Sequence, residues 1–291
     1  MPTLSTVSRL SLKNILVPTD FSPASQDAVP FAQTLAETYG STVLFAHAVA
    51  PQPHRRIVTE RIPEEDEAVW QDARQKLDTF AHEAACNALT WKTMLSRGDV
   101  ADVIPKMIAE HGVDLIVLGT HGRRGVSKMI LGSQAEKIYR QADCPVLVVG
   151  PKVRPTDEWK LRQILYPVDR SVPELALHYA LSLAEENQSS LLLMEAFPLV
   201  PWQHREGVER SSRRAMEDLV PRQAGDWCNP EYVVRWEQPG EAIVSLAQKR
   251  EVDLIVMSVH RSHVSSRSHL PWPLSSEVIG QVHCPVLTIR V

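Results

Sequence analysis

The sequence predicts an α/β protein made of two similar halves, each an open, doubly wound parallel sheet of five strands. Three observations predict this. Short apolar runs alternate with amphipathic helical patterns, which indicates crossover connections between parallel strands. The same order of segments occurs twice, as expected for a duplicated domain. The chain has 291 residues, enough for two domains of ordinary size.

The first half begins with three segments of clear type. Residues 14–18 form a continuous apolar run, typical of a strand buried on both faces. Residues 24–39 carry an apolar stripe at helical spacing, although Pro30 lies inside it and predicts a late start or a kink. Residues 42–49 are strand-like, and residues 64–89 carry a long apolar stripe on one helical face.

The rest of this half continues the alternation. We expect a strand over 91–96, a helix over 100–111 that Gly112 ends, and a buried strand over 115–118. A glycine-rich stretch follows, then a helix over 133–142 and a strand over 146–149. In such sheets ligands bind outside the carboxyl ends of the strands, at the switch point. Asp20, which ends the first strand, and Gly119, which ends the fourth, should therefore lie close together.

Four segments recur in order, which defines the domains. The pairs are 15–22 and 164–171, 35–37 and 183–185, 113–117 and 252–256, and 144–147 and 284–287. Pro151 and Pro155 bracket the joint and favour an extended connector. We predict domains over 1–150 and 161–291, with a linker over 151–160.

Four of the twelve glycines lie between positions 119 and 132. Glycines after a buried strand let backbone amides approach a ligand closely, and the next helix adds the positive end of its dipole. This combination predicts a phosphate site. The stretch is neither a P-loop nor a G-x-G dinucleotide fingerprint. A glycine-rich loop without a ligand is the alternative.

The spacing of Gly119, Gly122, Gly132 and Ser133 resembles the nucleotide-binding signature G-x2-G-x9-G-[ST] of the universal stress protein family. Residues 135–137 and 144–149 are also similar to that family. The resemblance implies a Rossmann-like fold of the adenine nucleotide alpha hydrolase type, present in tandem. It implies ATP as the ligand and allows Mg²⁺ to bridge the phosphates.

The resemblance and the loop chemistry together give the expected binding residues. Backbone amides of the signature would contact phosphate, Asp20 would lie by the adenine and ribose, and Val49 would contact the adenine through its backbone. The alternatives are helix caps for Asp20 and Ser133, solvated side chains for the loop histidine and arginine, and core for Val49. The expected set is Pro18, Thr19, Asp20, Val49, Gly119, His121, Gly122, Arg123, Gly132, Ser133 and Gln134.

The second half lacks this signature. Ser258 and Arg261 stand where Gly119 and Gly122 would be, and residues 261–276 contain no glycine. Residues 271–273, Pro-Trp-Pro, replace 131–133, and proline removes a backbone donor. Phe197 replaces Val49, whereas Asp169 persists at the position of Asp20. We therefore predict that only the first half binds nucleotide.

Composition excludes several other classes. The net charge is −4, so neither nucleic acid nor a membrane is an expected partner. No apolar run is long enough for a membrane span. The four cysteines form no C-x-x-C pair, and Cys144 and Cys284 are expected as buried structural thiols in a reduced, cytoplasmic protein. His260, His263 and His269 match no familiar metal-site spacing.

The sequence favours binding over catalysis. It has no P-loop lysine, no acidic metal ligands at a set spacing and no G-x-S-x-G nucleophile motif. The preferred hypothesis is an ATP-binding regulatory protein of the stress response with little or no turnover. Two alternatives stay open: an adenylating or slowly ATP-hydrolysing enzyme, and an adaptor without nucleotide.

Assembly is the last expectation. Members of the resembled family commonly pair through their last strands, so the two halves are expected to form an intrachain pseudo-dimer. Unsatisfied amides on edge strands favour such pairing. We also expect two chains to pair into a homodimer, and we expect a protein partner whose identity the sequence does not give.

Overall fold

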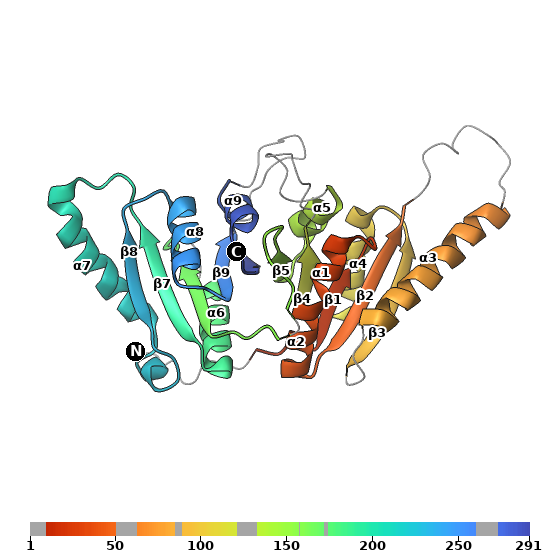
Figure 1. The fold of residues 1–291 in the computed structure, drawn as a ribbon, viewed down its shortest axis with the longest axis horizontal. Coiled ribbons are helices and arrows are strands. Elements are labelled where there is room, and N and C mark those ends of the chain that lie inside the picture. Colours follow the sequence, from red (N-terminus) through yellow and green to blue (C-terminus); the bar gives the residue numbers. More distant parts are fainter. Residues whose placement is uncertain are drawn as a thin grey trace. The chain divides into compact units, whose positions relative to one another are not determined.

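The computed structural model describes residues 10–50, 63–84, 89–120, 133–156, 158–171, 174–259 and 273–291. Strands and helices alternate along these residues (Figure 1). They form two compact units, one of residues 11–146 with 155–158 and the other of residues 147–154 with 159–291. The predicted domain boundary after residue 150 stays a prediction.

The described residues of the first copy form ten elements. They are β1 (Asn14–Pro18), α1 (Pro23–Asp27), α2 (Val29–Tyr39), β2 (Thr42–Val49), α3 (Pro63–Ala84), β3 (Thr90–Arg97), α4 (Val100–His111), β4 (Leu115–Gly119), α5 (Ser133–Gln141) and β5 (Val146–Val149).

Within the described residues, the second copy has a similar order, except that one helix follows its first strand and a 3₁₀ helix precedes its third strand. Its elements are β6 (Gln163–Pro167), α6 (Leu175–Asn187), β7 (Ser190–Ala196), α7 (Trp202–Leu219), the 3₁₀ helix η2 (Arg222–Asp226), β8 (Glu231–Arg235), α8 (Pro239–Lys249), β9 (Leu254–Val259), α9 (Pro273–Gln281) and β10 (Val286–Arg290).

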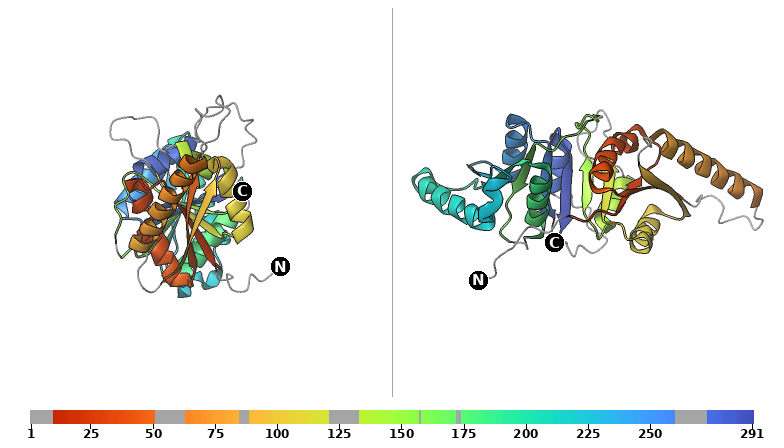
Figure 2. Two further views of the ribbon diagram at one scale, coloured as in Figure 1. Left: turned by 90° about the vertical axis from the view of Figure 1, so that its right-hand side faces the viewer. Right: turned by 90° about the horizontal axis from the view of Figure 1, so that it is seen from below.

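The strand order creates a switch point in each copy. In the first copy the order is β3-β2-β1-β4, and β1 pairs in parallel with β2 on one side and β4 on the other. In the second copy the order is β10-β9-β6-β7-β8, with β6 between β7 and β9. Helices lie on both sides of the strands in each unit (Figure 2). The predicted α/β fold with parallel strands is confirmed.

The predicted helix over 24–39 is two helices. Helix α1 ends at Asp27 and α2 begins at Val29, with Ala28 between them. Pro30 occupies the first turn of α2, where its missing N–H costs nothing. The kink expected at Pro30 is therefore a break two residues earlier.

The strand cores are almost fully buried. Ile15, Leu16 and Val17 of β1 have no exposed surface, and neither do Ile164 and Leu165 of β6. Such continuous burial is the pattern of strands covered on both faces. Residues in the loops at the strand ends can change without disturbing this core, so a ligand site can be built there.

Two sequence expectations concern thiols and membranes. Cys284 is buried, which raises its pKa to about 12, as expected for a structural thiol. Cys144 is only half-buried, so the expectation of a buried thiol is wrong there. Within the described residues, every helix is too short or too polar to cross a membrane.

Candidate functional site

The turn after β1 carries three of the expected residues. Pro18 is buried at the end of the strand, and Thr19 continues the ladder because its N–H donates to the Ala46 carbonyl oxygen at 2.8 Å. The Thr19 Oγ1 accepts the Phe21 N–H at 2.9 Å and lies 3.0 Å from Ser25 Oγ. Thr19 is thus a buried support for the turn.

Asp20 is the exposed member of this turn. Its Oδ1 accepts the Ser22 N–H at 3.1 Å. The N-cap of α1 is Ser22 itself, whose Oγ accepts the Ser25 N–H. Asp20 therefore does not cap the helix directly. The residue is exposed at the carboxyl end of β1.

Phe21 has a strained backbone that aromatic contacts stabilise. Its φ of +62° is unusual for a residue with a bulky side chain. The ring packs 4.5 Å from the His47 ring and 6.1 Å from Phe80, measured between centroids. The His47 Nδ1 lies 2.8 Å from the Thr19 carbonyl oxygen, which can only accept, so Nδ1 carries the proton.

Gly119, at the end of β4, is in close contact with the start of α1. A Cβ built at Gly119 would lie 1.7 Å from the Ala24 carbonyl oxygen. The ends of β1 and β4 therefore adjoin, as the predicted switch point requires. This contact also gives Gly119 a packing role that does not depend on any ligand.

A chain of contacts links Val49 to helix α5. The Val49 carbonyl oxygen accepts the Gly98 N–H at 3.0 Å, and Asp99 caps α4 by accepting the Ala101 N–H. Lys137 of α5 donates to both Asp99 carboxylate oxygens, at 3.0 and 2.8 Å. That hydrogen bond, followed by the one from Ala101, lowers the pKa of Asp99.

The remaining expected residues are only partly described. Ser133 begins α5, and Gln134 is exposed beside it. His121, Gly122, Arg123 and Gly132 lie outside the described residues. The described part of the site is thus its frame: the turn after β1, the ends of β2 and β4, and the start of α5.

Comparison with known proteins identifies the family of the chain. The sequence profile described as Universal stress protein family matches residues 11–150 and again residues 160–290. The chain belongs to the universal stress protein family.

Single-copy universal stress proteins each match about half of the chain. Universal stress protein MJ0531 of Methanocaldococcus jannaschii is 31% identical, covering 47% of this chain and 81% of that protein. Universal stress protein A homolog 1 of Coxiella burnetii is 30% identical, covering 48% of this chain and 97% of that protein.

Solved structures match over the whole chain. A universal stress protein from Archaeoglobus fulgidus has a TM-score of 0.65 and 16% identity, covering 97% of this chain and 99% of that one. At this identity the likeness shows the fold alone. A universal stress protein in complex with cAMP is 22% identical over 48% of this chain, with a TM-score of 0.33, too low for an argument.

The second universal stress copy keeps two hydrogen bonds of the corresponding turn. The Val168 N–H donates to the Met194 carbonyl oxygen at 2.8 Å, as Thr19 does to Ala46. The Asp169 Oδ1 accepts the Ser171 N–H at 2.9 Å and the Ser171 hydroxyl at 2.5 Å. The ladder bond and the aspartate turn are therefore kept in both copies, whereas Phe21 has a positive φ and Arg170 does not.

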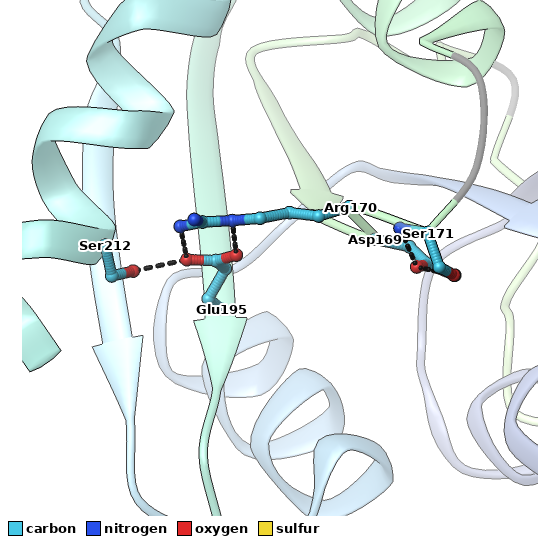
Figure 3. A network of polar contacts seen from close by, with 5 residues as sticks. All are labelled: Asp169, Arg170, Ser171, Glu195 and Ser212. Atoms are coloured by element: carbon cyan, nitrogen blue, oxygen red, sulfur yellow. Dashed lines mark hydrogen bonds and ion pairs between the residues drawn. The ribbon is translucent and has the colours of Figure 1, made fainter.

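The side chains of the second copy form an ion pair where the first has aromatic rings. Arg170 donates through Nε and Nη2 to the two Glu195 oxygens, each at 2.5 Å (Figure 3). Ser212 of α7 donates to the same carboxylate. Because Glu195 is only 7% exposed, its charge needs these partners. Arg170 and Glu195 align with Phe21 and His47.

Sequence reasoning did not single out His47, Phe21 or the Arg170–Glu195 pair. A signal was present in the strands, since His47 and Glu195 each interrupt an otherwise apolar run. A polar residue in such a run requires a partner. Neither partner could be identified from its strand alone. Among the described side chains, no group of three or more His, Cys, Asp or Glu residues could hold a metal ion.

Proposed function

We propose that the first copy binds ATP and that the second copy binds no nucleotide. The observation that carries the proposal is the meeting of two strand ends: Gly119 of β4 lies against the first turn of α1, next to the exposed Asp20. A nucleotide across this switch point would place its ribose and base by Asp20 and Val49. Its phosphates would extend toward the glycine signature and the start of α5.

The described residues fit such a ligand. Asp20 offers a carboxylate that can accept from a ribose hydroxyl or an exocyclic amine. Helix α5 presents its N-terminus, where backbone N–H groups favour phosphate. Since the described residues offer no cluster of metal ligands, Mg²⁺ would be held mainly by phosphate oxygens.

The second copy keeps a carboxylate, Asp169, at the position of Asp20 but differs in the rest of the site. Its only described cation at the turn, Arg170, is held by Glu195 in two hydrogen bonds. Helix α9 begins with Pro273, which has no N–H to offer where α5 begins with Ser133. Polyphosphate would therefore find neither a free guanidinium nor a full set of backbone donors there.

We further propose a regulatory protein of the stress response with little or no turnover. Calorimetric titration with ATP and Mg²⁺ tests binding: we expect one ATP per chain, and loss of binding in Gly132→Val. Asp20→Asn should weaken ATP binding about tenfold through loss of one charge-assisted hydrogen bond. Its counterpart Asp169→Asn should bind ATP as the wild type does.

Three outcomes would contradict the proposal. Unchanged binding by Gly132→Val would remove the assigned phosphate site, and a second ATP per chain would show a functional second copy. Pyrophosphate exchange or ADP release at typical enzyme rates would make the protein an enzyme. The last of these outcomes corresponds to the enzyme that the sequence left open as an alternative.

A further inference from the structure

The turn after β1 is held by two residues that are distant from it in the sequence. The His47 ring contacts the turn twice: its Nδ1 donates to the Thr19 carbonyl oxygen at 2.8 Å, and its centroid lies 4.5 Å from that of the Phe21 ring. Phe21 also packs on Phe80 of α3, with their centroids 6.1 Å apart. His47 thus holds both the start of the turn and the aromatic residue within it.

Both supporting residues are anchored in the packed core. Phe80 is buried, and its ring meets that of Phe45 edge-on, with centroids 5.7 Å apart. His47 is half-buried in β2 and follows Ala46, whose carbonyl oxygen accepts the Thr19 N–H. The two supports are therefore fixed relative to β2, and they can hold a strained residue in place.

The left-handed conformation of Phe21 sets the path of the chain from β1 into α1. Its φ of +62° is a conformation that residues with a side chain adopt only at a steric cost. The first turn of α1 then lies very close to the end of β4, since a Cβ at Gly119 would be 1.7 Å from the Ala24 carbonyl oxygen. Relaxation of Phe21 would therefore move α1 away from Gly119 and separate two parts of the proposed nucleotide site.

The second copy lacks all three of these features at the corresponding positions. Glu195 replaces the histidine, and Arg170, which replaces the aromatic residue, does not have a positive φ. Arg170 and Glu195 pair with each other and line a cavity of about 520 Å³, so this turn borders a cavity where the first packs on rings (Figure 3). Ser258 stands at the position of Gly119, and its side chain leaves less room for a close approach.

We propose that His47 is a positioning residue of the nucleotide site. It holds Phe21 in the left-handed conformation and so keeps α1 against the end of β4. In this role His47 acts through Phe21 and needs no contact with the ligand. The inference rests on the proposed binding of ATP by the first copy.

Rescue by glycine tests this role. His47→Ala should weaken ATP binding about tenfold, because only a fraction of the molecules keeps the binding-competent turn. Glycine adopts a positive φ without steric cost, so adding Phe21→Gly should restore the affinity to within about threefold of the wild type. Adding Phe21→Ala instead should restore nothing. Calorimetric titration of the full-length protein with ATP and Mg²⁺ measures these affinities, and His82→Ala, which removes an exposed histidine from α3, should bind as the wild type does.

Amide exchange followed by NMR reports on the same turn without nucleotide. The Ser25 N–H donates to the Ser22 Oγ, and the Gln26 N–H donates to the Ser22 carbonyl oxygen. Exchange of these two amides should become faster in His47→Ala and slower again in the double variant with Phe21→Gly. If the wild type bound no ATP, the proposed function would fall, whereas the exchange rates would still decide whether His47 holds the turn.

General destabilisation gives a different pattern from a positioning role. A first copy that merely unfolds more easily in His47→Ala could not be rescued by Phe21→Gly, because the double variant has lost a second ring. Failure of glycine to restore ATP affinity would therefore overturn the proposal. So would unchanged affinity or unchanged amide exchange in His47→Ala, or equal restoration by glycine and alanine at position 21.

Discussion

Phe21 shows how a single residue distinguishes the two copies. A left-handed conformation costs a residue with a side chain about 1–2 kcal/mol, and such strain is often found at functional sites. The contacts with His47 and Phe80 stabilise this conformation. Among described non-glycine residues only Phe21, Gln188 and Glu251 have positive φ, so Arg170, at the equivalent position, is relaxed. The strained turn is thus confined to the copy with the nucleotide signature.

Gly119→Ala is expected to destabilise the first copy. The added methyl group would overlap the Ala24 backbone, which cannot move aside as a flexible side chain can. Overpacking of this kind costs about 1–3 kcal/mol, and it would displace α1 and the turn that bears Asp20. The measurement is the midpoint of urea unfolding, together with ATP affinity.

Gly207→Ala is the matched control for this substitution. Gly207 lies in α7 with nothing within 4 Å of an added Cβ. Alanine there should stabilise the helix by about 0.5–1 kcal/mol. If Gly119→Ala were as stable as the wild type, the packing role assigned to Gly119 would be wrong.

At the scale of elements, the strand and helix order followed from the sequence because burial and periodicity are local properties. The run 115–118 and the helix before Gly112 correspond closely to β4 and α4. The break at Ala28 was harder to place, since Pro30 is compatible with either a kink or a new helix start. The local sequence pattern thus identified the helical region but could not decide between a kink and a new helix start.

The site was predictable only in part. The meeting of the β1 and β4 ends follows from the parallel topology, so Asp20 and Gly119 could be paired in advance. The Arg170–Glu195 pair could not, because it joins a loop residue to a strand residue across 25 positions. The link between helices α4 and α5 illustrates the same limit. Asp99, which caps α4, forms an ion pair with Lys137 of α5, the helix that begins at Ser133, and no sequence spacing reveals that ion pair.

The position of α5 should depend on pH through that ion pair. The hydrogen bond from Lys137 lowers the pKa of Asp99 from its ordinary value of 3.8. A depressed carboxyl pKa contributes stability that is present above the unfolded-state value and is lost as pH falls through the folded-state value. Lys137→Met should therefore be less stable than the wild type near neutral pH, and the difference should shrink as pH falls below the ordinary value and vanish below the lowered, folded-state pKa of Asp99.

Urea unfolding midpoints at a series of pH values measure this effect. Lys106→Met removes an exposed lysine from α4 and controls for the loss of a positive charge alone. Added salt should reduce the difference, because Lys137 and Asp99 are both partly exposed. A difference between Lys137→Met and wild type that persists unchanged into acid would show that the pair does not stabilise α5 through charge.

At the scale of the whole molecule, the duplication places different side chains on one common frame. Both copies keep the parallel strands, the Asx-type turn at Asp20 or Asp169, and the ladder bond that follows the first strand. They differ most clearly in the side chains at the strand ends. The first copy has aromatic side chains and the glycine signature, whereas the second has a buried ion pair and a cavity. Changes at these ends leave the buried strand cores intact.

This division predicts that ATP protects one copy and not the other. A ligand that binds only the folded state stabilises it by about 2.7 kcal/mol when its concentration is 100 times the dissociation constant. Amide hydrogen exchange should therefore slow in β1, β4 and α5 on addition of ATP and Mg²⁺. Exchange in β6, β7 and β9 should be unchanged, because the ligand makes no contact there. Gly132→Val, which should not bind ATP, provides the control. Equal slowing of amide exchange in both copies would contradict the prediction, because it would show that nucleotide stabilises the chain as a single cooperative unit.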